Sequence, residues 1–230
     1  MPGTEPRALP ADDALRDVTE LGGFFVLPAG GGGHGAGAPS FAEGFAARAR
    51  EVNRRYATTT EARVGWSIAH LGLAARLWSP LLACTVLHGI VLDLSRVEWA
   101  DDSSAIRLRG AAEGRLVAPF RLPDVVEAVY EQVAGPLAAL ESTFDVKVAP
   151  RLLDGNVASA LVGSAAVLLR ARPGTGPAVT RLTHALLGTG RLTGTGRVTG
   201  PGLSFRRNSC CLYYRAPGGG KCGDCCLTGR

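Results

Sequence analysis

The sequence predicts an α+β protein with a mainly helical body, a small β-hairpin or sheet, and a cysteine-rich C-terminal loop suited to a metal centre. Three observations lead to this prediction. Apolar residues recur at helical spacing through much of residues 40–187. An alternating stretch interrupts them at 105–122, and five of the six cysteines follow Arg206. We therefore divide the chain into an N-terminal segment with a Gly-rich linker (1–39), a helical body (40–200) and a C-terminal metal-binding segment (201–230).

The composition indicates a globular protein that neither binds nucleic acid nor crosses a membrane. Hydrophobic residues make up 46% of the 230 positions, and the net charge of +5 is spread without a dense Lys/Arg stripe. The longest apolar run, Leu81–Leu92, is interrupted by His88 and is shorter than the roughly 20 residues that a membrane span needs. The polar N-terminus lacks the apolar region of a signal peptide. We expect a cytoplasmic protein without a transmembrane segment, in a compartment that keeps thiols reduced.

The N-terminal segment is expected to contain little regular structure. Residues 11–21 have a short helical pattern, and Phe24–Leu27 is a strand or an apolar latch. Pro28–Pro39 is a Gly-rich connector. It lacks the Lys-Ser/Thr that completes a phosphate-binding Walker motif.

Two capping boxes mark the first helices of the body. Ser40 with Glu43 begins one helix, and Thr58 with Glu61 begins a second that runs to about Ser79.

The next helix is expected to lie at the centre of the core. Pro80 begins it, and residues 80–93 are apolar on nearly all sides. We interpret His70 and His88 as hydrogen-bonded core histidines and Cys84 as a small buried residue. The three tryptophans either fill the core or line a pocket for a bulky chelate.

The second half begins with a predicted β-hairpin, in which Ile106–Arg109 pairs with part of Arg115–Leu122. Three helices are expected after it, at 123–144, 156–172 and 178–187. Asp154 or Asn156 caps the second of these. The repeat in Gly188–Gly200 lacks the spacing of a Rossmann fingerprint, so no nicotinamide or flavin site is expected.

The C-terminal cysteines have the number and spacing of a metal-ligand set. Cys210 and Cys211 are adjacent, and after ten residues Cys222 and Cys225 form a C-x-x-C pair. Four thiolates suit an iron–sulfur cluster or a structural zinc. Cys226 is a fifth thiol that could replace Cys225, but we take Cys225 as the ligand because C-x-x-C is the commoner arrangement. Cations around the ligands lower thiol pKa values and offset the negative charge of the centre; they are Arg206, Arg207, Arg215 and Lys221.

Several alternatives stay open on spacing alone. A [4Fe–4S] cluster needs the same ligands as a [2Fe–2S] cluster. A structural zinc is usually bound by two pairs of ligands, and the two residues of each pair are separated by a few positions. The adjacent pair Cys210 and Cys211 has an unfavourable geometry for a tetrahedral ion. Disulfides would need an oxidising compartment. At the level of function, the alternatives are an iron- or redox-sensing Fe–S binding protein and a zinc-stabilised interaction module.

The segment RRNSCCLYYRAPGGGKCGDC resembles the C-terminal motif of the FhuF-like siderophore-iron reductases. A weaker similarity covers LAARLWSPLL at 73–82. The extra Cys226 and the short, Gly-rich approach to the motif depart from the family pattern. The resemblance implies a [2Fe–2S] cluster as cofactor, bound by Cys210, Cys211, Cys222 and Cys225.

The resemblance also implies a ferric-siderophore reductase, an oxidoreductase that reduces chelated Fe(III) by one electron and releases iron as Fe(II) in the cytoplasm. The helical body at 40–200 would then bind the siderophore, expected to be of the hydroxamate type. Because no second cofactor site is readable, an external electron donor such as a ferredoxin or a flavin reductase is implied. No catalytic or substrate-pocket residue can be assigned from the sequence.

Overall fold

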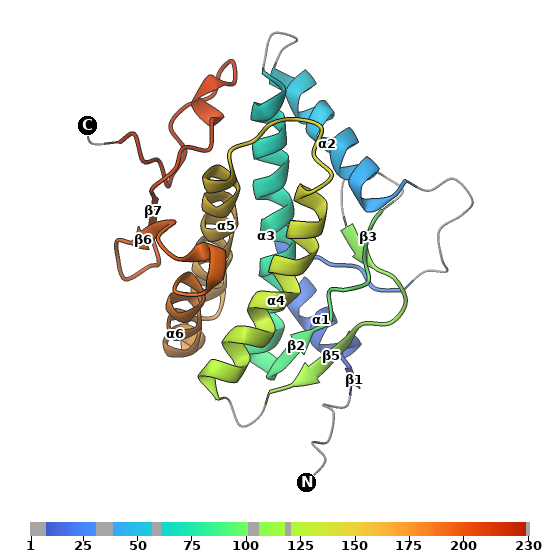
Figure 1. Ribbon diagram of the computed structural model, residues 1–230. Helices are drawn as coiled ribbons and strands as arrows, with labels where there is room; N and C mark the ends of the chain where they lie inside the picture. Colours follow the sequence, from blue (N-terminus) through green and yellow to red (C-terminus); the bar gives the residue numbers. More distant parts are fainter. Residues whose placement is uncertain (1–7, 31–38, 57–60, 101–105, 118–120, 229–230) are drawn as a thin grey trace.

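The computed structural model describes residues 8–30, 39–56, 61–100, 106–117 and 121–228 (Figure 1). Most of the described chain is helical, which confirms the predicted α+β class with a mainly helical body. The α-helices are α1 (Asp12–Thr19), α2 (Phe41–Tyr56), α3 (Ala62–His88), α4 (Leu122–Glu141), α5 (Pro150–Ala171) and α6 (Gly176–Leu187). The strands are β1 (Ala8–Pro10), β2 (Ile90–Leu92), β3 (Val97–Trp99), β4 (Ile106–Leu108), β5 (Glu113–Leu116), β6 (Gly196–Val198) and β7 (Phe205–Arg207).

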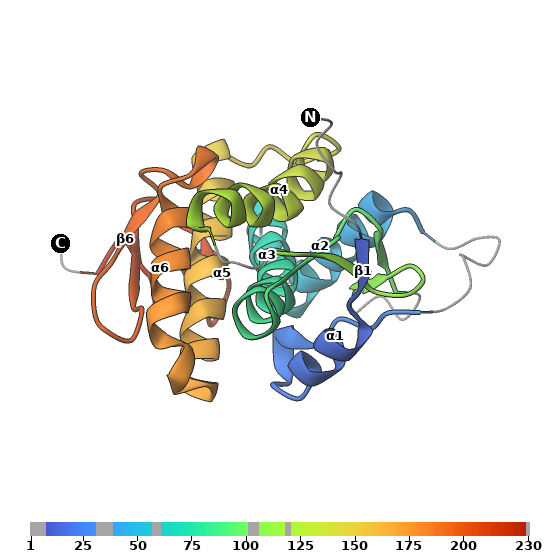
Figure 2. The same cartoon turned by 90° about the horizontal axis from the view of Figure 1, so that it is seen from below.

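Helix α3 is the centre of the body. Seen along its axis, it lies between α5 and α2, with α4 and α1 on its other two sides (Figure 2). Several buried hydrogen bonds join α3 to α5; among them, the Trp78 indole donates to the Val157 carbonyl (3.1 Å), and the hydroxyls of Ser79 and Ser164 are 2.8 Å apart. Small residues on α5 allow this close approach, so the two helices form the rigid support for the chain that follows.

The prediction of a new helix at Pro80 is wrong, because α3 runs through that position without interruption. A proline inside a helix removes one backbone hydrogen bond and costs about 3 kcal/mol. Here the neighbouring Leu77, Leu81 and Leu82 are fully buried, and each contributes about 1.5–3 kcal/mol on burial. Packing therefore outweighs the proline. The helix ends instead at Gly89, whose left-handed backbone (φ 67°) caps it.

The predicted N-terminal elements are confirmed in part. Helix α1 lies within the range expected for it, and the Ser40–Glu43 capping box is present, with the Glu43 carboxylate accepting from the Ser40 amide at 2.9 Å. Phe24–Leu27, expected to be a strand or an apolar latch, is not a strand: a 3₁₀ turn, η1 (Gly23–Phe25), lies there, and Phe25 and Leu27 are buried in the core. Thr58, the first residue of the second capping box, lies outside the described residues.

The predicted β-hairpin is also wrong. Strand β4 pairs with β3, whereas β5 lies between β1 and β2 in a different, three-stranded sheet. The two strands were expected to pair because a glycine-containing turn separates them. Their actual partners lie earlier in the chain, so the glycine turn connects two sheets.

The helices of the second half are confirmed, with one correction to a boundary. Helix α5 begins at Pro150, so neither Asp154 nor Asn156 caps it. Both residues lie inside the helix and make contacts with distant segments. Asn156 donates to the Ser67 carbonyl of α3 (2.9 Å), and Asp154 accepts from Arg191 (2.6 Å).

The residues expected in the core are buried, with one exception. All three tryptophans and Cys84 are buried, and His70 is fully buried with its Nε2 atom 2.8 Å from Glu141. The side chain of His88 is 30% exposed and pairs with Asp17 of α1 (2.9 Å), so His88 lies at the edge of the core.

The division of the chain into three segments remains a prediction.

Helices α3 and α5 are long and apolar enough, by length and composition, to cross a membrane. In the structure, however, 72% and 78% of their apolar windows are buried against the rest of the protein. Buried helices at the centre of a globular core have this same composition.

Candidate metal centre

The cysteine segment follows strand β7 and lies beside the first turns of α3 and α5 (Figure 1). Two buried hydrogen bonds fix it there. The Ser67 hydroxyl of α3 donates to the Cys211 carbonyl at 2.8 Å, and the Arg207 guanidinium donates to the Leu152 carbonyl of α5 at 3.1 Å. The helical body therefore positions the chain immediately before and within the first cysteine pair.

The structure brings the two halves of the cysteine motif together. The sulfur atoms of Cys211 and Cys222 are 3.4 Å apart, and the Cys210 thiol lies close enough to Cys211 and Cys225 for their charges to interact. All six cysteines are free thiols. Across the described ranges, no three His, Cys, Asp or Glu side chains converge as a closed metal site. The direct contact is therefore between one sulfur from each half of the motif.

Each of the four predicted ligands accepts a hydrogen bond from the backbone amide two residues further along the chain. The donors are Leu212 to Cys210 (3.4 Å), Tyr213 to Cys211, Asp224 to Cys222, and Leu227 to Cys225 (3.4 Å). Leu212 takes a left-handed conformation (φ 66°), which turns the chain sharply after the adjacent pair. Amide donors stabilise thiolates and tune the potential of iron–sulfur clusters. The repeated pattern therefore supplies one backbone amide donor to each of the four sulfurs.

The contact between Cys211 and Cys222 shifts their pKa values in opposite directions. The hydrogen bond between the two thiols lowers the pKa of Cys211; burial opposes this shift, and the Tyr213 amide and the Arg207 charge assist it. The same hydrogen bond, together with burial, raises the pKa of Cys222. Burial, assisted by the charge of Asp17, raises the pKa of Cys84 to about 12. The contact therefore favours ionisation of Cys211 over Cys222, and the thiolate is the form that binds metal.

Arg207 places a buried positive charge behind the ligands. Its side chain is only 2% exposed, and its Nε atom has no partner in the part of the chain that the structure describes. Its charge lowers the pKa of both Cys211 and Cys222. Gly155 makes room for it, because a Cβ atom there would lie 2.7 Å from the guanidinium. A buried cation beside four thiolates offsets the charge that such a ligand set accumulates.

These features fit an iron–sulfur cluster. Cys210, Cys211, Cys222 and Cys225 would hold it, since all four sulfurs come from one short segment and accept amide hydrogen bonds. The buried charge of Arg207 acts on two of them, Cys211 and Cys222. The assignment of these four as ligands stays a prediction. Cys226 is half-buried, and its charge also acts on Cys210.

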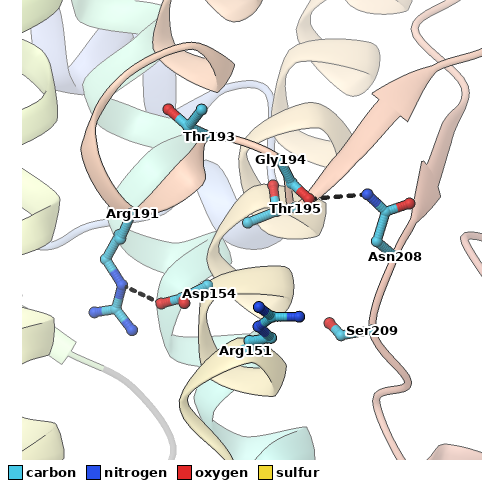
Figure 3. A pocket seen from close by; sticks show the side chains of 8 residues that line it. All are labelled: Arg151, Asp154, Arg191, Thr193, Gly194, Thr195, Asn208 and Ser209. Carbon is cyan, nitrogen blue, oxygen red and sulfur yellow. Dashed lines mark hydrogen bonds and ion pairs between the residues drawn. The ribbon is translucent and has the colours of Figure 1, made fainter.

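A polar cavity of about 350 Å³ lies directly before the cysteine pair (Figure 3). Its walls come from the first turns of α5, from the chain after the 3₁₀ turn η3 (Gly190–Leu192), and from Asn208 and Ser209. Arg191 lies in one wall and forms ion pairs with Asp154 (2.6 Å) and with Glu141 of α4 (2.8 Å). These pairs hold α4, α5 and η3 together around the cavity.

The sequence analysis named Arg207 among the cations around the ligands, but it predicted neither the burial of this side chain nor this cavity. Arg206 and Arg207 are adjacent in the sequence, and nothing local to them shows which one turns inward. The available signal was the position of Phe205: in strand β7 residues two apart point to the same face, so Arg207 shares the buried face of Phe205. The cavity walls come from segments more than 35 residues apart in the chain, as the 37-residue separation of Asp154 and Arg191 shows.

Comparison with known proteins agrees with the cysteine segment. No curated protein shows significant similarity to the chain. Residues 207–227 match the family model of the FhuF 2Fe-2S C-terminal domain. The match contains Arg207 and all of the C-terminal cysteines, and it leaves the helical body outside. The C-terminal segment of the chain is therefore similar to the FhuF 2Fe-2S C-terminal domain, and its cofactor is a [2Fe–2S] cluster.

Proposed function

We propose that this protein is a ferric-siderophore reductase, which delivers one electron to chelated Fe(III) and releases iron as Fe(II) in the cytoplasm. The observation that carries the proposal is the cysteine segment: four sulfurs with amide donors and a buried arginine, within the residues that match the FhuF 2Fe-2S domain. When bound, a [2Fe–2S] cluster supplies one-electron transfer. One electron is also what the reduction of one ferric ion requires.

The release of iron follows from the chemistry of the substrate. Hard oxygen donors such as hydroxamates bind Fe(III) tightly and Fe(II) much more weakly, so each electron accepted by the chelate loosens one iron ion. The part of the protein is to hold the chelate beside the cysteine pair. The cavity at Asn208 and Ser209 lies next to Cys210 and is open to a ligand from outside.

The electron is expected to come from a separate protein. The sequence has no nicotinamide or flavin motif, so we infer a donor such as a ferredoxin or a flavin reductase. Arg215 is already paired with Glu61 (2.6 Å), but Lys221 is an exposed cation of the cysteine segment, and an exposed cation suits the acidic surface of a ferredoxin.

The proposal can be tested by anaerobic stopped-flow spectroscopy. The dithionite-reduced protein, freed of excess dithionite, is mixed with a series of ferric hydroxamate and carboxylate chelates, and a ferrous-specific dye traps the product. We expect visible absorbance to return as Fe(II) appears, at one Fe(II) per reduced protein. If no chelate reoxidises the protein and iron is lost from the protein instead, the reductase proposal is wrong and a sensing role is favoured.

A further inference from the structure

The cavity beside Cys210 contains two arginines in different environments. Arg191 forms ion pairs with both Glu141 and Asp154, at 2.8 and 2.6 Å. Arg151 lies in the first turn of α5, and its guanidinium points across the cavity between Asp154 and Ser209 (Figure 3). It is exposed and makes no ion pair with any residue that the structure describes. The two arginines and the two carboxylates balance in number, but the Arg151 guanidinium faces the cavity without a direct ionic partner among the described residues.

The helix that carries Arg151 adds a positive potential at this end of the cavity. The N-terminus of a helix has a partial positive charge, which favours acidic side chains and disfavours basic ones. The first turn of α5 contains no acidic residue. An arginine at this end is electrostatically unfavourable in the free protein, and a bound anion would remove that cost.

The remaining polar groups divide into those that shape the wall and those that face the cavity. The Asn208 amide donates to the Gly194 carbonyl (2.8 Å), and the Thr195 hydroxyl donates to the Leu192 carbonyl (2.6 Å), so both fix the wall. The hydroxyls of Thr193 and Ser209 line the space as further hydrogen-bond donors. A guanidinium with neighbouring hydroxyls is a set of donors suited to a carboxylate.

We infer that this cavity binds a free carboxylate of an anionic ferric chelate and so holds the chelate beside Cys210. The inference rests on the proposed function. It adds where the chelate binds and that the chelate is an anion. Ser209 directly precedes Cys210, and consecutive Cα atoms are about 3.8 Å apart, so a ligand touching Ser209 lies next to the cysteine pair. A volume of about 350 Å³ is at the lower end for a small-molecule site. The cavity therefore accepts one arm of a chelate, while the iron stays outside the cavity.

The test measures binding to the oxidised, cluster-loaded protein by titration calorimetry. The anionic probe is ferric citrate, and the neutral probe is ferric tris(acetohydroxamate). Arg151→Gln removes the guanidinium that has no ion-pair partner among the described residues. Arg170→Gln is the matched control, because Arg170 is exposed on the same helix at its opposite end. Both variants change the net charge equally.

We expect Arg151→Gln to weaken ferric citrate binding about tenfold, the effect of losing one charge-assisted hydrogen bond near the surface. Arg170→Gln should change it less than twofold, and neither variant should alter binding of the neutral chelate by more than twofold. Equal effects of the two variants on ferric citrate would overturn the inference. So would iron-free citrate that binds as tightly as ferric citrate, since the cavity would then be a simple anion site.

Failure of the inference and failure of the proposed function can be told apart. If no ferric chelate reoxidises the reduced wild-type protein, the reductase proposal fails. If ferric chelates reoxidise it but Arg151→Gln behaves like Arg170→Gln, only the cavity assignment fails.

Discussion

Replacement of Arg207 by glutamine tests how the buried charge acts on the metal centre. The side chain is 2% exposed, donates to the Leu152 carbonyl at 3.1 Å, and acts electrostatically on both Cys211 and Cys222. Reduction adds one negative charge to the centre, and a nearby cation stabilises the reduced state more than the oxidised state. Arg207→Gln should therefore shift the midpoint potential to a more negative value.

Coulomb's law gives the size of the shift. Two unit charges 4 Å apart interact by about 4 kcal/mol at an effective dielectric constant of about 20. A separation about twice as large, suited to a guanidinium behind the ligands, gives about 2 kcal/mol. For a one-electron couple this corresponds to a shift of about 90 mV. Loss of the hydrogen bond to Leu152 should also lower the free energy of unfolding by about 1–3 kcal/mol.

The assay is an anaerobic potentiometric titration followed by the visible spectrum, with two further variants. Arg206→Gln removes a charge one residue away, but Arg206 is partly exposed. At a dielectric constant near that of water the shift should be about four times smaller, or about 20 mV. Arg207→Lys keeps the charge and should stay within about 30 mV of the wild type. Equal shifts for Arg207→Gln and Arg206→Gln, or an unchanged potential in Arg207→Gln, would refute the reasoning.

Two further predictions concern how the body supports the centre. Gly155→Ala places a Cβ atom 2.7 Å from the Arg207 guanidinium, and overpacking of this kind costs about 1–3 kcal/mol; iron content and melting temperature should both fall. Gly163→Ala in the same helix meets nothing within 4 Å and should leave both unchanged or slightly raise the melting temperature. Glu141→Gln removes a carboxylate whose pKa is lowered by its hydrogen-bonding partners despite the opposing effect of burial. The ion pair between Glu141 and Arg191 of η3 (2.8 Å) is then lost. Calorimetry at pH 7.5 should show that the free energy of unfolding falls by about 2 kcal/mol. Glu131→Gln, at an exposed position, is the control and should change the free energy of unfolding little. Because the pKa of Glu141 is lowered in the folded protein, the stabilisation that its carboxylate provides is present above the unfolded pKa and is lost as pH falls. The difference in the free energy of unfolding between the wild type and Glu141→Gln should therefore become smaller below about pH 4.5.

The parts of the fold that local sequence determines were predictable. The Ser40–Glu43 capping box needs only residues three apart, and the structure confirms it. The path of α3 through Pro80 was not predictable locally, because it depends on burial against α5 and α2. The pairing of β4 and β5 with different sheets likewise depends on strands that precede them in the chain. Strand pairing over long separations leaves little local signal.

The candidate site divides in the same way. Cys210, Cys211, Cys222 and Cys225 lie within one segment, and their spacing alone indicated four metal ligands. The burial of Arg207 and the cavity at Arg151 come from the packing of this segment on helix α5, and no spacing within the segment shows them. The ligands and the cations near them were therefore predictable from the sequence, while the burial of Arg207 and the cavity were not.

The most direct test of the account is quantitative iron, sulfide and EPR analysis of the dithionite-reduced protein and its single cysteine variants. We predict two irons, two sulfides and one unpaired spin per wild-type chain. Cys226→Ala should retain all three, and alanine at any of the four predicted ligand positions should lower them to less than one fifth. Wild-type protein that contains zinc in place of iron would contradict the account, as would a Cys225→Ala variant that keeps its full signal while Cys226→Ala loses it.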